Sequence, residues 1–178
     1  MHPNTPRTPH KPASDTSPVP RRIDQLLDSY AESHQHPTNK LIHWVCVPAI
    51  TWCVLVGFYL LPYPEAMGQA SGMNWMWIFL AFSLTYYMRL SKPLTMGFLV
   101  AVTVCVALIG GYEALYAHTQ TLSLGSFAAL VFVLAWIGQF IGHRIEGKKP
   151  SFLQDLQFLL IGPAWLLHFI YKKWGIRY

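Results

Sequence analysis

The sequence predicts an all-α fold: a polytopic integral membrane bundle of helices. Of its 178 residues, 53% are hydrophobic and only 12% are charged, about half the charged share of a typical soluble domain. The apolar residues gather in long runs that approach the ~20 residues needed to cross a bilayer as a helix. A helix satisfies its own backbone hydrogen bonds, so it is the form that such runs take in lipid. Lys and Arg cluster beside these runs, which is typical of membrane proteins.

The N-terminal segment divides into a tail and a helix. Residues 1–20 are rich in Pro, Thr and Ser, so we expect a disordered tail before a single membrane domain over 21–178. Beyond it, apolar side chains recur at helical spacing and predict an amphipathic helix over 22–35 at the membrane surface. Pro37 interrupts this helix, and Thr38 is the candidate cap of the next one.

Four apolar runs predict four membrane spans, and a fifth segment is of a different kind. The four runs cover about 41–61, 74–90, 94–115 and 123–142. The fifth, from Phe152 to about residue 171, begins with polar residues and contains Gly162 and Pro163. It could span, but its polar start and its helix breakers favour a re-entrant or interfacial helical hairpin.

The loops predict an orientation. Residues 62–73 and 116–122 contain no Lys or Arg, whereas the two remaining turns are basic, with Arg89, Lys92, Arg144, Lys148 and Lys149. The positive-inside rule then places the basic turns and the N-terminus in the cytoplasm. We expect an integral protein of a bacterial inner membrane, or of the endoplasmic reticulum in a eukaryote.

Several other classes are disfavoured. The positive charges mark topology and form no basic face, so we do not expect a nucleic-acid partner. Cys46, Cys53 and Cys105 sit inside apolar runs and are expected to be buried free thiols. The chain has no Walker loop, no G-x-S-x-G and no G-x-G-x-x-G.

Two polar stretches stand at the cytoplasmic ends of apolar runs. In "SYAESHQHPTNKLIHW", Tyr30 and His34 are four residues apart, as are Asn39 and His43. Such pairs share one face of a helix. In "WIGQFIGHRIEGKKP", a further stripe consists of Gln139, His143 and Glu146. A polar stripe in lipid is costly unless it faces the bundle interior, so we expect the two stretches to meet there.

The residue types in this cluster suit a metal. Imidazole and carboxylate ligands with open positions are typical of non-haem Fe(II) oxygenases. The candidate ligands and catalytic residues are His34, His43, His143 and Glu146, and Tyr30, Asn39 and Gln139 are expected to orient them. His36, next to Pro37, falls outside the helical pattern and is expected to matter less.

Two alternatives remain open at this point. Histidines are common at membrane interfaces because they are amphipathic, so the cluster could be a non-catalytic one that holds helices together or binds lipid head groups. A bis-histidine haem between His43 and His143 is the other alternative, although it leaves Glu146, Gln139 and Asn39 without a purpose.

The two stretches also resemble a known family. Tyr30, His34, Asn39 and His43 fit Y-x3-H-x4-N-x3-H, and Gln139 to Pro150 fits Q-F-I-G-H-x2-E-x3-P. A later Gly162–Pro163 pair fits as well. Together they are similar to the fungal-type 2-hydroxy fatty acid (2-hydroxy-palmitate) dioxygenases, small membrane proteins formerly described as a domain of unknown function. The resemblance covers about residues 22–175, and the compact loops are typical of a bacterial member.

The resemblance implies an Fe(II)-dependent dioxygenase of fatty acid α-oxidation. Such an enzyme converts a 2-hydroxy fatty acid and O2 to a fatty acid one carbon shorter. The family's histidines match His34, His43 and His143, and its nearby acid matches Glu146. The implied partners are a 2-hydroxy fatty acid or another lipid substrate, O2 and the membrane lipids.

Overall fold

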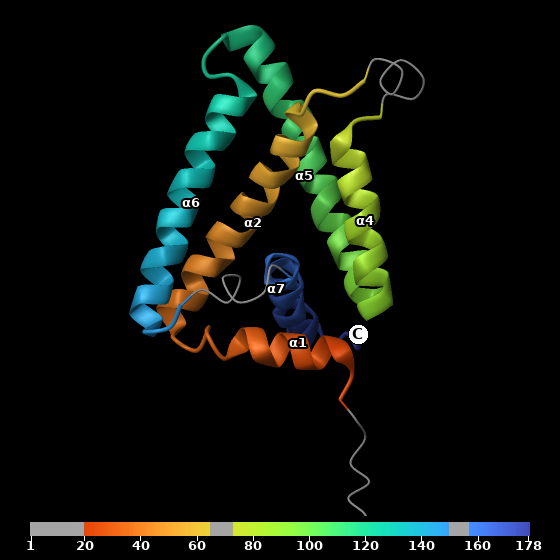
Figure 1. The fold of residues 1–178 in the computed structure, drawn as a ribbon, viewed down its shortest axis with the longest axis vertical. Helices are drawn as coiled ribbons and strands as arrows, with labels where there is room; N and C mark the ends of the chain where they lie inside the picture. The colour runs from red at the N-terminus through yellow and green to blue at the C-terminus, as the bar shows by residue number, and fades with distance from the viewer. Residues whose placement is uncertain (1–19, 65–72, 150–156) are drawn as a thin grey trace, which may run out of the picture.

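The computed structural model describes residues 20–64, 73–149 and 157–178, and in these ranges every regular element is a helix (Figure 1). The helices are α1 (Arg22–Ala31), α2 (Pro37–Leu60), α4 (Trp75–Leu90), α5 (Lys92–Thr119), α6 (Leu124–Glu146) and α7 (Phe158–Trp174). The predicted all-α class is therefore confirmed for this part of the chain. The predicted tail, apart from Pro20, lies outside the described residues.

Among the described helices, three are long and apolar enough to cross a membrane, namely α2, α5 and α6. They correspond to the first, third and fourth predicted spans. The second predicted span is α4, which has 16 residues and would be about 24 Å long at 1.5 Å per residue. That is less than the ~30 Å hydrocarbon core of a bilayer, so a crossing by α4 stays a prediction.

Helix α1 is shorter than predicted. It ends at Ala31, and residues 32–36 form a turn that leads into α2. Its apolar side chains are buried, and it packs against α7; these side chains are Ile23, Leu26, Leu27 and Tyr30. The predicted cap of α2 was wrong by two residues, because the side chain of His36 accepts the hydrogen bond from the backbone N–H of Thr38. Pro37 takes the first helical position, where its missing N–H has no cost.

Helices α2 and α6 pack closely because small residues lie between them. A Cβ atom on Gly138 would lie 2.7 Å from Cys46 Sγ, and one on Gly142 would lie 2.3 Å from Asn39 Oδ1. These two glycines form a G-x-x-x-G pair, the spacing that lets two helices approach closely in a membrane. The pair brings the end of α6 that carries His143 against the start of α2.

Helix α7 corrects the prediction for the fifth segment. Its described residues form one continuous helix through Gly162 and Pro163, so the predicted break into a hairpin at this pair is wrong. Proline in a helix frees carbonyl groups in the preceding turn, and neighbouring side chains can bind them. The N–H that Pro163 lacks would have bonded to the Leu159 carbonyl, and the Tyr87 hydroxyl donates to the next carbonyl of that turn, that of Leu160. Its predicted polar start, apart from Gln157, lies outside the described residues.

The helices have two distinct ends in Figure 1. Helix α1, the α4–α5 turn, the C-terminal end of α6 and the C-terminus lie together at one end. The C-terminal end of α2 and the α5–α6 turn lie at the other. The first of these ends carries the two polar stretches.

Candidate metal centre

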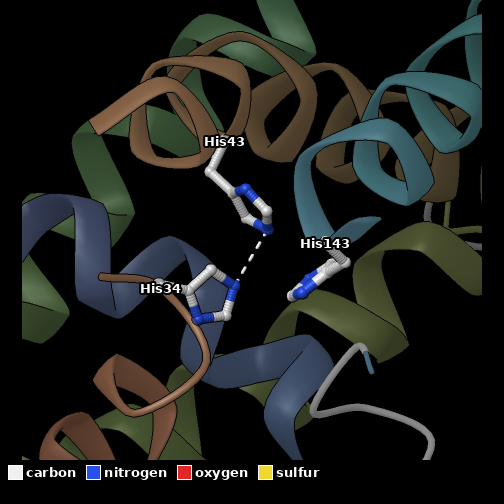
Figure 2. A group of neighbouring side chains, drawn as sticks. All are labelled: His34, His43 and His143. Atoms are coloured by element: carbon white, nitrogen blue, oxygen red, sulfur yellow. Dashed lines mark hydrogen bonds between the residues drawn. The ribbon is translucent and has the colours of Figure 1, made fainter. Parts of the chain in front are cut away.

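Three histidines from three segments converge on one point (Figure 2). His34 comes from the turn after α1, His43 from the first turns of α2, and His143 from the last turns of α6. The ring centroids lie 4.3 Å (His34–His43), 4.9 Å (His34–His143) and 5.0 Å (His43–His143) apart. One ligand atom of each lies within 4.8 Å of the other two. All three side chains are at least 95% buried, with exposed fractions of 1%, 1% and 5%.

Hydrogen bonds to backbone carbonyls determine which ring nitrogen of His34 and of His43 carries the hydrogen. The Nδ1 atom of His34 lies 2.6 Å from the carbonyl oxygen of Tyr30, and that of His43 lies 2.9 Å from the carbonyl oxygen of Asn39. A carbonyl only accepts hydrogen bonds, so each Nδ1 carries the hydrogen and donates it. In the neutral rings, each Nε2 then presents a lone pair.

The two Nε2 atoms face each other at 2.9 Å. Two lone pairs at this distance repel each other unless a proton or a cation lies between them. Two nitrogens bound at right angles to one metal ion, each at about 2.1 Å, lie about 3.0 Å apart. The pair therefore has the spacing of two adjacent ligands of one ion. His143 Nδ1 is buried without a hydrogen-bond partner among the described residues, so this ring too has a nitrogen to offer.

Burial keeps the His34 imidazole uncharged. Burial first, and then the neighbouring His43, lower the pKa of His34 to about 3. The ring is therefore neutral at pH 7, and neutral imidazole is the form that binds metals. Tyr30 stacks on His34 with ring centroids 4.1 Å apart and an interplanar angle of 10°. Trp165 packs on another side, 5.2 Å from the His34 centroid.

Glu146 supports the site from its outer side. Its two oxygens each accept a backbone N–H at 2.7 Å, one from Gln35 and one from His36. The Asn39 amide donates to Glu146 at 3.1 Å and to the Ser33 carbonyl at 3.2 Å. These bonds fasten the turn that carries His34 to the ends of α2 and α6. Direct metal binding by Glu146 stays a prediction.

The structure brings together most of the residues that the sequence singled out. Tyr30, His34, His43, Gln139 and His143 all line one cavity of about 50 Å³. Asn39 lies beside it through its bonds to His43 and Glu146. His36 instead caps α2, and His168 contacts the Tyr178 hydroxyl. Pro150 of the second motif lies outside the described residues.

Sequence reasoning missed the aromatic wall of the site. Trp165 and Phe158 come from the fifth segment, where they read as ordinary membrane residues, yet Trp165 packs on His34 and Phe158 lines the cavity. Trp165 is two residues after Pro163, and no spacing in the sequence connects it with a histidine more than 100 positions earlier.

The fold and this site define a class of protein. Three long apolar helices are compatible with a membrane protein, and three buried histidines at the end of this bundle could hold a metal ion. Residues 21–174 match the family described as 2-hydroxy-palmitic acid dioxygenase Mpo1-like. The chain belongs to this Mpo1-like family, which confirms the resemblance of its two motifs. Searches of curated proteins and of solved structures gave no significant match.

Proposed function

We propose that the chain is an Fe(II)-dependent dioxygenase of fatty acid α-oxidation, acting on a 2-hydroxy fatty acid. The observation that carries the proposal is the pair of Nε2 atoms 2.9 Å apart, with both Nδ1 hydrogens engaged by carbonyls. Imidazole ligands suit zinc, copper, iron and nickel alike. The family description, a dioxygenase, favours iron among these metals.

The proposed reaction is balanced by O2 alone. A 2-hydroxy acid and O2 give the acid one carbon shorter, CO2 and water. The C1–C2 bond breaks, C1 leaves as CO2, and C2 becomes the new carboxyl carbon. The substrate loses four electrons and O2 accepts four, so no separate reductant is required. Bound Fe(II) would supply the O2 chemistry that side chains alone lack.

The residues of the chain hold and shield the metal position. His34, His43 and His143 are the proposed ligands, with Glu146 as the predicted fourth. The carbonyls of Tyr30 and Asn39 orient two of the rings, the kind of support that ligating histidines commonly have. Burial excludes bulk water from the three nitrogens. We place the site on the cytoplasmic side of a bacterial inner membrane, or of the endoplasmic reticulum.

A haem at this position finds no support in the geometry. The cavity that the histidines line has about 50 Å³, whereas pockets for drug-sized ligands run from about 300 to 1,000 Å³. A macrocycle between the His43 and His143 rings, whose centroids are 5.0 Å apart, would force α2 and α6 to separate.

Metal analysis of the detergent-purified chain tests the proposal. After anaerobic loading with Fe(II), we expect about one non-haem iron per chain, and loss of that iron in His34→Ala, His43→Ala or His143→Ala. His36→Asn is the matched control, because asparagine is a good helix cap. It removes an imidazole two residues from His34 but should keep the iron. A Soret band would instead indicate a haem protein, and absence of metal after loading would leave the non-catalytic alternative.

An oxygen-electrode assay tests the reaction itself. The iron-loaded chain should consume O2 with 2-hydroxypalmitate and release the acid one carbon shorter, with one CO2 per O2. The three histidine variants should be inactive, and His36→Asn should retain activity. No O2 uptake with 2-hydroxy acids of any length would refute the proposed activity.

A further inference from the structure

A second and much larger cavity lies beside the histidine site. It has a volume of about 620 Å³ and lies between α2, α5, α6 and α7. Its lining is almost wholly apolar and includes Val47, Trp52, Val102, Leu108, Phe127 and Leu167. None of the proposed metal ligands lines this larger cavity.

The two cavities adjoin each other. Val47 and Thr51, one turn apart on α2, line both of them. The Thr51 hydroxyl donates to the carbonyl of Val47 at 2.9 Å, so this wall presents methyl groups and no unpaired polar atom. A ligand with a polar head at the histidines could therefore extend past Val47 and Thr51 into an apolar space.

The large cavity is long as well as apolar. On α5 its lining runs from Phe98 to Tyr112, which corresponds to about 21 Å at 1.5 Å per residue. One leaflet of lipid tails, half of a ~30 Å hydrocarbon core, is about 15 Å thick. The cavity volume also falls within the range of pockets that enclose small-molecule ligands.

We propose that this cavity binds the acyl tail of the substrate. The carboxyl and 2-hydroxyl groups lie at the histidines, the chain passes Val47 and Thr51, and the methyl end lies toward Tyr112. The inference rests on the proposed function for the identity of the head group. It adds that the α5 wall sets which chain lengths the protein accepts.

Cys105 gives a test that does not depend on turnover. It is half-buried and lines the cavity about midway between Phe98 and Tyr112, whereas Cys46 and Cys53 are buried and do not line it. In the metal-free, detergent-purified full chain, 2-hydroxypalmitate at ten times its dissociation constant should slow N-ethylmaleimide labelling of Cys105 about tenfold. Peptide mass spectrometry would locate the label. 2-Hydroxybutyrate, which has the same head and almost no tail, should not protect Cys105.

Unchanged labelling at saturating 2-hydroxypalmitate would overturn the inference. Equal protection by 2-hydroxybutyrate would also overturn it, because the tail would then not be what fills the cavity. Burial in apolar surroundings can by itself keep a thiol protonated and unreactive; if Cys105 is unreactive before any acid is added, the length preference of the Cys105→Trp variant decides the inference.

A substitution tests chain-length selection separately. Cys105→Trp fills the cavity midway and should lower kcat/KM for 2-hydroxypalmitate at least about tenfold, while iron content and turnover of a short 2-hydroxy acid are kept. Val100→Trp is the matched control on α5, since Val100 is 65% exposed and does not line the cavity. An unchanged length preference in Cys105→Trp would contradict the inference.

The two tests separate this inference from the proposed function. Protection of Cys105 by 2-hydroxypalmitate without turnover of any acid would refute the oxygenase activity and leave the tail site standing. Turnover at the same rate for every chain length, with no protection of Cys105, would support the oxygenase activity and refute the tail site.

Discussion

Glu146 holds the His34 turn by backbone groups rather than by side chains. Its carboxylate receives the N–H groups of Gln35 and His36 just before α2 begins. A helix N-terminus carries a partial positive charge and unsatisfied N–H groups, so a carboxylate is favoured there. The end of α6 thus anchors the start of α2. The position of His34 depends on that anchor.

Glu146→Gln should weaken iron binding roughly 10- to 100-fold, the usual effect of losing a group that supports a ligand. The glutamine amide would direct N–H groups at a backbone donor, which loosens the turn but leaves three imidazoles in place. Titration of the metal-free chain with Fe(II) measures the affinity. Asp28→Asn, an exposed carboxylate of α1, is the matched control and should leave the affinity unchanged.

The absorption spectrum of the Co(II)-loaded chain separates support from ligation. If Glu146 only positions the turn, saturated Glu146→Gln should show the band shape and intensity of the parent. A changed coordination number would alter both and would identify Glu146 as a ligand.

Among single residues, the sequence singled out side chains that the structure brings together, but it did not reveal all of their contacts. Helical spacing and the two motifs singled out the three histidines, Asn39 and Glu146, because these side chains are costly in lipid without a partner. Besides Asn39, the partners of Glu146 are two backbone N–H groups, which every non-proline residue carries and no motif reveals. The capping role of His36 was missed for a related reason, since histidine is not among the usual N-cap residues.

At the scale of elements, the site depends on how closely α6 approaches α2. Gly142 directly precedes His143, and the Gly138–Gly142 pair faces Cys46 and Asn39. Larger side chains there would move His143 away from the other two rings. The interhelical distance therefore sets the spacing of the three histidines.

Gly142→Ala should destabilise the protein and impair iron binding together. A Cβ atom at this position would lie 2.3 Å from Asn39 Oδ1, and overpacking of this kind typically costs about 1–3 kcal/mol. Thermal unfolding in detergent and iron content are the measurements. Gly111→Ala is the matched control, because beyond its chain neighbours and the adjacent backbone of α5 no atom lies within 4 Å of its Cβ position, and alanine favours a helix. An equally stable, fully loaded Gly142→Ala variant would contradict the close-packing argument.

Hydrophobic runs predicted the long helices well and the fifth segment poorly. The first, third and fourth runs became α2, α5 and α6 because their length and composition leave little choice in lipid. The break expected at Gly162–Pro163 did not form. Proline strongly disfavours a helix in isolation, but Tyr87 binds a carbonyl of the turn before Pro163. Tertiary contacts of this kind, together with the packing of α7 against α1 and α5, have no signature in the local sequence.

In the whole molecule, the basic residues and the histidines lie at the same end of the helices. The described basic residues predicted to be cytoplasmic lie at the α4–α5 turn and at the end of α6. Figure 1 shows both of these regions at the end that holds α1 and the C-terminus. The histidines lie toward the same end. The positive-inside rule predicts that this end is cytoplasmic, and the predicted orientation therefore puts the histidines on the cytoplasmic side.

Single cysteines at opposite ends should report this orientation in intact bacterial cells. Thr121→Cys, in the α5–α6 turn, should react with a membrane-impermeant maleimide added outside. Arg177→Cys, near the C-terminus, should react only after permeabilisation, because basic segments stay in the cytoplasm. Both positions are exposed, so accessibility to solvent does not distinguish them, and the unmodified chain gives the background. The opposite labelling pattern would invert the assignment.

The hydrogen bonds from His34 to Tyr30 and from His43 to Asn39 span the same number of residues. His34 and His43 each direct Nδ1 to the carbonyl four residues earlier, and that carbonyl is a main-chain atom which any residue type supplies. Inserting one residue between Asn39 and His43, inside α2, would rotate the helix beyond it by about 100°, and one inserted between Tyr30 and His34 would change the turn that carries His34. The orientation of both rings thus depends on the number of residues in each interval. Substitutions at Tyr30 or Asn39 keep the carbonyl that orients the ring, whereas a one-residue insertion would displace it although every motif residue is still present.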